Sequence, residues 1–170
     1  MDYLYGNFTS QWFANFYLQE LDHYIKEKLK ASYYIRYMDD MVLFHRNKKE
    51  LHKIKDKIEI FLKQEKLALK ENWQLFKVDT RPIDFLGYRF YRGYTTLRRE
   101  NFLRIKRRAK RIYKRKKLTK KDASAMISYN GWLKHCDSRN FKQKYFNPYI
   151  NIEKCKGVLR NASRKQCQTK

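Results

Sequence analysis

The chain has 170 residues, enough for one domain or for two small domains packed together. Hydrophobic residues make up 42% of it, so a packed core can form and wholesale disorder is excluded. Its 41 lysines and arginines against 17 acidic residues give a net charge of +24. Such a charge excludes a neutral enzyme surface and favours a polyanionic partner, either nucleic acid or an anionic membrane.

The basic residues are concentrated in the second part of the chain. Residues 1–100 carry 19 basic and 14 acidic residues, whereas residues 101–170 carry 22 basic and 3 acidic ones. We therefore expect an ordinary folded body followed by a region that contacts a polyanion. No apolar run approaches the roughly 18 residues of a membrane span, and the N-terminus lacks the features of a signal peptide. Three widely spaced cysteines give no disulfide framework, which favours a cytoplasmic location.

The first half of the chain alternates helical and strand patterns. Ser10 can cap a helix over residues 11–29, where apolar side chains recur at helical spacing. Residues 33–38 and 41–44 are β-branched, aromatic and apolar, typical of two strands. Because Asp39 and Asp40 separate these strands, we predict a tight hairpin with two carboxylates at its tip. A further apolar stripe predicts a helix over residues 48–65.

The second half begins with strands and continues as helices. We expect one or two strands in residues 67–78, a strand over 83–91, a turn at 92–93 and a returning strand over 94–98. A strongly basic helix follows over residues 100–117. Thr119 and Asp122 form a capping-box pattern that opens a helix to about residue 135, and a short helix is expected over 139–146. The polar, basic tail over residues 151–170 has little to bury, so we predict disorder there.

Two adjacent aspartates between apolar strands need a physical reason, because like charges at a hairpin tip repel each other. A divalent cation removes this cost, and Mg²⁺ prefers carboxylate oxygens together with substrate phosphates. Two such ions about 3.5–4 Å apart can activate a hydroxyl and stabilise a leaving oxygen. Taken alone, however, the dipeptide also fits a plain turn in which aspartate makes local hydrogen bonds.

The two aspartates belong to the segment Tyr37-Met38-Asp39-Asp40, which lies between Ile35 and Val42-Leu43-Phe44. This segment resembles the catalytic hairpin of the reverse transcriptase family. Upstream, Gly6-Asn7-Phe8-Thr9-Ser10-Gln11 resembles the loop beside the incoming nucleotide. Downstream, Asn72-Trp73-Gln74 and residues 83–90 resemble later palm strands, and Phe85-Leu86-Gly87-Tyr88 matches the hairpin that grips the primer end. The Ser-Gln ending of the loop is most similar to the bacterial branch in diversity-generating retroelements, while group II intron and retron polymerases are the alternative relatives.

The resemblance implies an α+β fold and a set of site residues. Residues 1–98 would be a partial right-hand polymerase palm of antiparallel strands with helices, and residues 99–150 a basic α-helical thumb. Asp39 and Asp40 would be catalytic ligands of Mg²⁺ or Mn²⁺. The residues expected at the nucleotide are Gly6, Ser10, Gln11, Tyr37 and Met38. Those expected at the primer end are Phe85, Leu86, Gly87 and Tyr88.

The basic segment over residues 98–121 holds 14 lysines and arginines and one acidic residue. Like charges one turn apart destabilise an isolated helix, and phosphates would relieve this repulsion while releasing counterions. We therefore expect an RNA template and a DNA primer as partners, with deoxynucleoside triphosphates as substrates and no membrane. The residues predicted to contact the nucleic-acid backbone are Arg98, Arg99, Arg104, Lys106, Arg107, Arg108, Lys110, Arg111, Lys114 and Arg115.

The match to the family decays upstream of Gly6. The family carries a further metal-binding aspartate and the fingers before this loop, and Asp2 does not match that aspartate. We therefore expect an N-terminally truncated family member, and three hypotheses stay open. The chain is an RNA-directed DNA polymerase, or a catalytically inactive remnant that binds nucleic acid, or one half of a split polymerase completed by a fingers chain. An accessory protein is a further partner that the resemblance allows.

Overall fold

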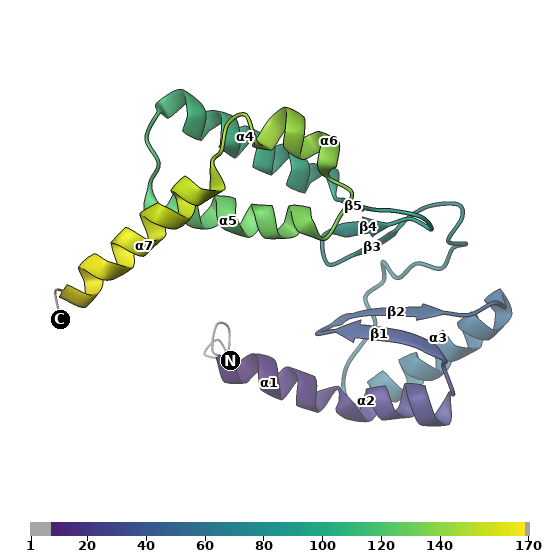
Figure 1. The fold of residues 1–170 in the computed structure, drawn as a ribbon. Coiled ribbons are helices and arrows are strands. Elements are labelled where there is room, and N and C mark those ends of the chain that lie inside the picture. Colours follow the sequence, from purple (N-terminus) through teal and green to yellow (C-terminus); the bar gives the residue numbers. More distant parts are fainter. Residues whose placement is uncertain (1–7, 169–170) are drawn as a thin grey trace. The chain divides into compact units, whose positions relative to one another are not determined.

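The computed structural model of the protein describes residues 8–168, apart from the side chains of residues 8, 10, 11 and 163–168. The chain divides into two compact units, Met1–Leu75 and Phe76–Lys170 (Figure 1). Both units combine helices with antiparallel strands, which agrees with the predicted α+β class. The first unit has 13 basic and 11 acidic residues, whereas the second has 28 basic and 6 acidic ones. Nearly all of the net charge therefore belongs to the second unit.

The first unit packs a β-hairpin against helices. Its elements are α1 (Phe8–Tyr17), α2 (Gln19–His23), the π-helical turn η1 (Tyr24–Lys28), β1 (Tyr33–Tyr37), β2 (Asp40–Phe44) and α3 (Lys48–Gln64). The hairpin and α3 confirm the predicted pattern. The buried core consists of Leu21, Ile25, Ala31, Ile58 and Leu62. On the hairpin, the side chains that pack against this core are Tyr34, Met41 and Leu43.

Two predictions for the first unit are wrong. The single helix expected over residues 11–29 is three helical segments, and the first begins at Phe8, so Ser10 lies inside α1 rather than at its cap. Residues 67–78 form no strand. Trp73 in that loop packs on α3 instead, in a T-shaped contact with the His52 ring and with the Lys55 ammonium 5.0 Å from its ring centroid. This segment therefore packs on α3 through its side chain instead of pairing as a strand.

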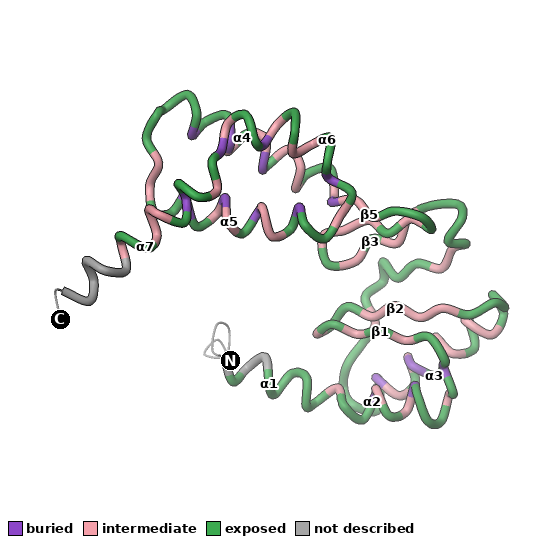
Figure 2. Tube along the Cα trace, viewed as in Figure 1, coloured by how far each residue is buried: buried purple, intermediate pink, exposed green. Residues whose placement is uncertain are grey.

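The second unit joins a three-stranded sheet to a helical bundle. The strands β3 (Ile83–Phe85), β4 (Tyr88–Phe90) and β5 (Thr95–Leu97) pair in sequence order. The helical segments are α4 (Arg99–Arg115), α5 (Lys120–Lys134), α6 (Arg139–Phe141), η2 (Lys142–Phe146) and α7 (Ile152–Gln168). Figure 2 shows buried positions recurring along α4 and α5. They include Ile105, Ala109, Ile112, Ala123, Met126 and Leu133. The Thr119 side chain accepts a hydrogen bond from the Asp122 amide, as the capping-box pattern predicted.

The second unit corrects two further expectations. The strand expected over residues 83–91 is broken by a turn at Leu86 and Gly87. This hairpin lies in the compact unit that begins at Phe76. The tail expected to be disordered from residue 151 forms α7 over Ile152–Gln168, because Cys155 is buried in the core and Ile152, Val158 and Leu159 pack against it.

Candidate active-site hairpin and nucleic-acid interface

The two aspartates occupy different positions in the β1–β2 hairpin. Tyr37 pairs with Asp40, so Met38 and Asp39 form the two-residue turn and Asp40 is the first residue of β2. Met38 has a backbone φ of 55°, in the left-handed region. A residue with a Cβ atom carries strain of about 1–2 kcal/mol there. Observed strain at a turn next to two carboxylates is typical of a functional position.

Asp39 is exposed and already has a cationic partner. Its Oδ2 accepts a hydrogen bond from Lys70 Nζ at 2.9 Å, in an ion pair whose two side chains are about 70% exposed. The hydrogen bond from Lys70 holds the pKa of Asp39 below its ordinary value. A metal ion at Asp39 would therefore compete with the ammonium of Lys70. Sequence reasoning missed Lys70 because it lies 31 positions along the chain, in the loop after α3.

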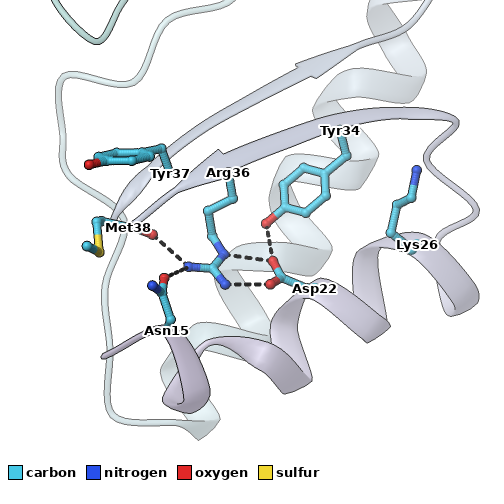
Figure 3. Close-up of a pocket in the computed structure, with 7 residues that line it drawn as sticks. All are labelled: Asn15, Asp22, Lys26, Tyr34, Arg36, Tyr37 and Met38. Carbon is cyan, nitrogen blue, oxygen red and sulfur yellow. Dashed lines mark hydrogen bonds and ion pairs between the residues drawn. The ribbon is translucent and has the colours of Figure 1, made fainter. Parts of the chain in front are cut away.

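A hydrogen-bond network anchors the hairpin to α2 (Figure 3). The Asp22 carboxylate accepts hydrogen bonds from the Tyr34 hydroxyl at 2.7 Å and from Nε and Nη2 of Arg36. Arg36 Nη1 in turn donates to the carbonyl of Met38 at 2.9 Å, so the network reaches the strained turn. Burial alone would raise the pKa of Asp22, but the hydrogen bonds from Arg36 and Tyr34 outweigh it and the pKa lies below its ordinary value.

The sequence prediction did not identify this network, although β1 carries a signal for it. Alternation places Tyr34 and Arg36 on one face of the strand, opposite the exposed Tyr33, Ile35 and Tyr37. The face of Tyr34 is also the one that packs on the core. A charged side chain on an inward-facing strand position requires a partner, because an unpaired buried charge is costly. The sequence does not show which residue of the preceding helix is the partner of Arg36.

A pocket of about 320 Å³ lies beside the hairpin and is drawn in Figure 3. It brings together Tyr37 and Met38, two of the residues predicted at the nucleotide, with five residues that were not predicted. Those five are Asn15, Asp22, Lys26, Tyr34 and Arg36. The other predicted nucleotide contacts cannot be placed, because Gly6 and the side chains of Ser10 and Gln11 lie outside the described residues.

The carboxylates of Asp39 and Asp40 fit part of a divalent-metal site. Carboxylate oxygens suit Mg²⁺ and Mn²⁺, and Asp39 in the turn and Asp40 at the start of β2 each supply one carboxylate. Among the side chains that the structure describes, however, no group of three or more histidines, cysteines, aspartates or glutamates could hold a metal ion. A complete site would need at least one further ligand beyond the hairpin.

The predicted primer-binding residues form a second tight hairpin. Phe85 pairs with Tyr88, and the turn residues Leu86 and Gly87 both have positive φ, 52° and 83°. Such a two-residue turn favours glycine. A Cβ atom on Gly87 would also lie only 3.1 Å from the side-chain amide of Asn101. The Gly87 carbonyl accepts hydrogen bonds from the backbone of Arg98 and from Asn101 Nδ2. The turn is thereby fixed against the start of α4.

The predicted backbone-contacting residues lie along α4, and several already have partners. Arg98 forms an ion pair with Asp84, while Arg108 and Arg115 both bind Asp122 on α5. The Lys106 ammonium lies 3.9 Å from the ring centroid of Tyr145. The remaining predicted residues of the helix are Arg99, Arg104, Arg107, Lys110, Arg111 and Lys114, all exposed. Sequence reasoning treated Asp122 as a capping residue only, and did not foresee its two arginine partners.

Asp122 stays ionised although it is almost buried. Burial alone would raise its pKa, but hydrogen bonds from Thr119, Arg115 and Arg108 together outweigh this effect. The pKa of Asp122 therefore lies below its ordinary value. The carboxylate fixes two guanidinium groups at the boundary between α4 and α5.

Comparison with known protein families shows to which family the chain belongs. The sequence profile described as Reverse transcriptase (RNA-dependent DNA polymerase) matches residues 5–90, half of the chain, including both hairpins. The chain belongs to the reverse transcriptase family. The resemblance seen in the sequence is thereby confirmed at the level of the family, which implies RNA, DNA and nucleotide substrates. No curated protein matches this reverse transcriptase chain. None of its described helices has the length and apolar character needed to cross a membrane.

Proposed function

We propose that the chain is the palm–thumb portion of an RNA-directed DNA polymerase of the diversity-generating retroelement branch. The observation that supports this function best is the Tyr-Met-Asp-Asp segment within the family match, folded as a hairpin with Asp39 in its turn and Asp40 beside it. Residues 1–98, which carry both hairpins, would correspond to the palm. The helices within residues 99–150 would form the thumb and contact the template–primer duplex.

In this proposal each hairpin has its own task. Asp39 and Asp40 would hold a divalent metal, Mg²⁺ or Mn²⁺, which supplies Lewis-acid activation of the primer hydroxyl and the nucleotide phosphates when it is bound. Tyr37 and Met38 border the pocket where the nucleotide would bind. The Asp22–Arg36 network keeps the turn in its strained conformation through the Met38 carbonyl, so the carboxylates are preorganised.

The hairpin over residues 85–88 would position the primer end. Its turn is rigid, because the Gly87 carbonyl is bound by two donors from the start of α4. Tyr88 is held as well, since its hydroxyl donates to the Trp132 carbonyl at 3.2 Å. A rigid contact suits a role in which small displacements of the reacting group lower the rate strongly.

A second candidate function is a chain that binds nucleic acid but cannot polymerise by itself. It is favoured by one observation: among residues 8–168 the hairpin aspartates have no third ligand nearby for a metal ion. The chain would then be an inactive remnant or one half of a split polymerase, completed by a fingers chain, with group II intron or retron enzymes as the alternative relatives. An accessory protein would be a further partner.

Primer extension on an RNA template separates these candidates. We expect the 170-residue chain alone to show no or very weak extension, and activity to appear when a fingers segment is supplied as a second polypeptide. Robust extension by the chain alone, abolished by Asp39→Asn, would show that another carboxylate completes the site. Extension that survives both Asp39→Asn and Asp40→Asn would refute the role of the hairpin.

A further inference from the structure

Helix α1 carries its aromatic residues on the side that is turned away from its own unit. At 100° per residue, Trp12, Phe13, Phe16 and Tyr17 fall within an arc of about 140°, which we call the aromatic face. These four residues are 70%, 64%, 65% and 52% exposed, in that order, and every residue from 12 to 17 is exposed (Figure 2). The helix of a globular protein normally buries such an apolar stripe.

The opposite side of α1 holds the helix to the first unit. Asn15 Oδ1 accepts a hydrogen bond from Nη1 of Arg36 on β1 at 3.1 Å, and Leu18, directly after the helix, packs against the core. Tyr17, at one edge of the aromatic face, donates its hydroxyl to the Glu65 carbonyl at 2.7 Å, and half of the residue stays exposed. The first unit therefore contacts α1 through its polar side and leaves the large aromatic rings in solvent.

The aromatic face lies in an uncharged stretch of a highly charged chain. Charged residues make up 34% of the sequence, but residues 3–19 contain no lysine, arginine, histidine, aspartate or glutamate. With 13 basic and 11 acidic residues the first unit has a net charge of only +2, against +24 for the whole chain. Two copies of so basic a protein repel each other across most of their surface. At the aromatic face they can meet without bringing like charges together.

The exposed aromatic area is large enough for a contact between two copies. One aromatic side chain has about 150–250 Å² of surface, so the exposed fractions of the four residues amount to about 500 Å² per copy. A contact between two such faces would bury about 1,000 Å² in total, which is the lower limit for a specific interface. An apolar patch of several hundred Å² on a soluble protein commonly marks an interaction site.

We propose that the aromatic face of α1 is a self-association surface, through which two copies of the chain form a homodimer about a two-fold axis. In a two-fold contact each copy supplies the same patch, so no partner of different composition is required. Phe13 and Phe16, at the centre of the arc, supply most of the affinity. An interface of this area corresponds to a weak dimer, with a dissociation constant in the micromolar range. This inference goes beyond the proposed function and does not depend on it.

Two other occupants fit the aromatic face less well. Proteins bind single-stranded nucleic acid with aromatic rings in combination with cations, and this face carries no cation. A helix at a membrane interface presents lysines and arginines on its polar side, whereas the polar side of α1 has neither and contacts Arg36 of β1. A second copy needs only what the face itself offers, which is apolar area without charge.

Sedimentation velocity of the nuclease-treated, full-length chain tests the dimer across a range of protein concentrations. We expect a monomer–dimer equilibrium that becomes tighter from low to high KCl, because salt screens the repulsion between two basic copies. Association bridged by residual nucleic acid would weaken with salt and would contradict the proposal.

Two matched variants test the surface. Phe16→Gln removes one ring of the aromatic face from each copy and should weaken the dimer about tenfold or more. Ile60→Gln removes an apolar residue that is 59% exposed on another helix of the same unit, α3, and should change the dissociation constant less than about twofold. Far-ultraviolet circular dichroism of both variants, measured where the wild type is monomeric, should match the wild type and shows that the fold is intact.

Hydrogen exchange locates the contact. Peptides covering residues 12–17 should exchange more slowly above the dissociation constant than below it. A chain that stays monomeric in high KCl, or a dimer that Phe16→Gln leaves unchanged, would overturn the proposal. Protection of residues 12–17 in the monomer would overturn it too, because the second unit of the same chain would then cover the face. Protection that requires phosphatidylcholine vesicles or a fingers segment would assign the face to a membrane or to that partner, and would also overturn the homodimer.

Discussion

Replacing Asp22 by asparagine should loosen the β1–β2 hairpin. The carboxylate is the acceptor for three hydrogen bonds, one from Tyr34 and two from Arg36. The Arg36 side chain is only 10% exposed, so the substitution leaves a nearly buried cation without its counter-ion. Removing one partner of a fully buried pair costs about 3–5 kcal/mol. Because Asp22 is one-third exposed and asparagine keeps one acceptor oxygen, we expect a loss of about 2 kcal/mol.

Hydrogen exchange followed by mass spectrometry measures this loss of stability in the hairpin itself. A loss of about 2 kcal/mol corresponds to roughly 30-fold faster exchange in peptides covering residues 33–44, since 1.4 kcal/mol is a factor of ten. Peptides from the second unit should not change. Glu20→Gln is the matched control, because it makes the same carboxylate-to-amide change at an exposed position of the same helix, α2. It should leave exchange in residues 33–44 unaltered.

Two results would refute the reasoning about Asp22. If Asp22→Asn left exchange in residues 33–44 unchanged, the network would contribute nothing to the hairpin. If the Glu20→Gln control accelerated exchange as strongly, the effect would come from the general charge of α2. Combining Asp22→Asn with Arg36→Met should cost less than the sum of the two single substitutions, because the cation left unpaired by the first is removed by the second.

Three further changes have defined outcomes. Lys70→Gln removes the ammonium that competes for the Asp39 carboxylate, so Mn²⁺ titration followed by electron paramagnetic resonance should show binding strengthened about two- to fivefold, an effect that Asp39→Asn abolishes. Gly87→Ala should destabilise the second unit by about 1–2 kcal/mol in thermal melts, because φ is 83° there, whereas Gly93→Ala, which adds its Cβ in open space, should be tolerated. The pKa of Asp122 is lower in the folded than in the unfolded chain, so its stabilisation is complete above the ordinary carboxyl range and is lost as the pH falls through the folded pKa. Melting temperatures should therefore fall below about pH 4, and less steeply in Asp122→Asn; a parallel fall in both proteins would contradict this assignment.

The sequence predicted those parts of the fold that depend on local pattern. The β-branched, aromatic and apolar residues on both sides of Asp39 and Asp40 predicted the first hairpin, and the Thr119 cap predicted the start of α5. The tail was misjudged because its basic residues obscured a helical stripe, in which Ile152, Cys155 and Leu159 pack on or within the core. Charge on the outer face of a helix does not prevent burial of the inner one.

Parts of the site that depend on long-range contacts could not be predicted. The pairing of Asp22 with Arg36 joins a helix to a strand, and the pairing of Lys70 with Asp39 joins a loop to a turn. Neither has a periodic signature in the sequence. The basic residues of α4 are visible in the sequence, but the partner that Arg108 and Arg115 share is Asp122 of the neighbouring helix. Sequence patterns predict the helices and strands, whereas the partners of the charged side chains are set by tertiary packing.

Photo-crosslinking from the primer terminus tests the proposed polymerase role most directly, because it requires binding but no catalysis. A DNA primer with a photoreactive 3′-terminal nucleotide is annealed to an RNA template, irradiated with the chain, and the adducts are mapped by mass spectrometry. We predict adducts within residues 37–40 and 85–88, the two hairpins assigned to the metal and the primer end. Adducts confined to other segments, with neither hairpin labelled, would contradict the account.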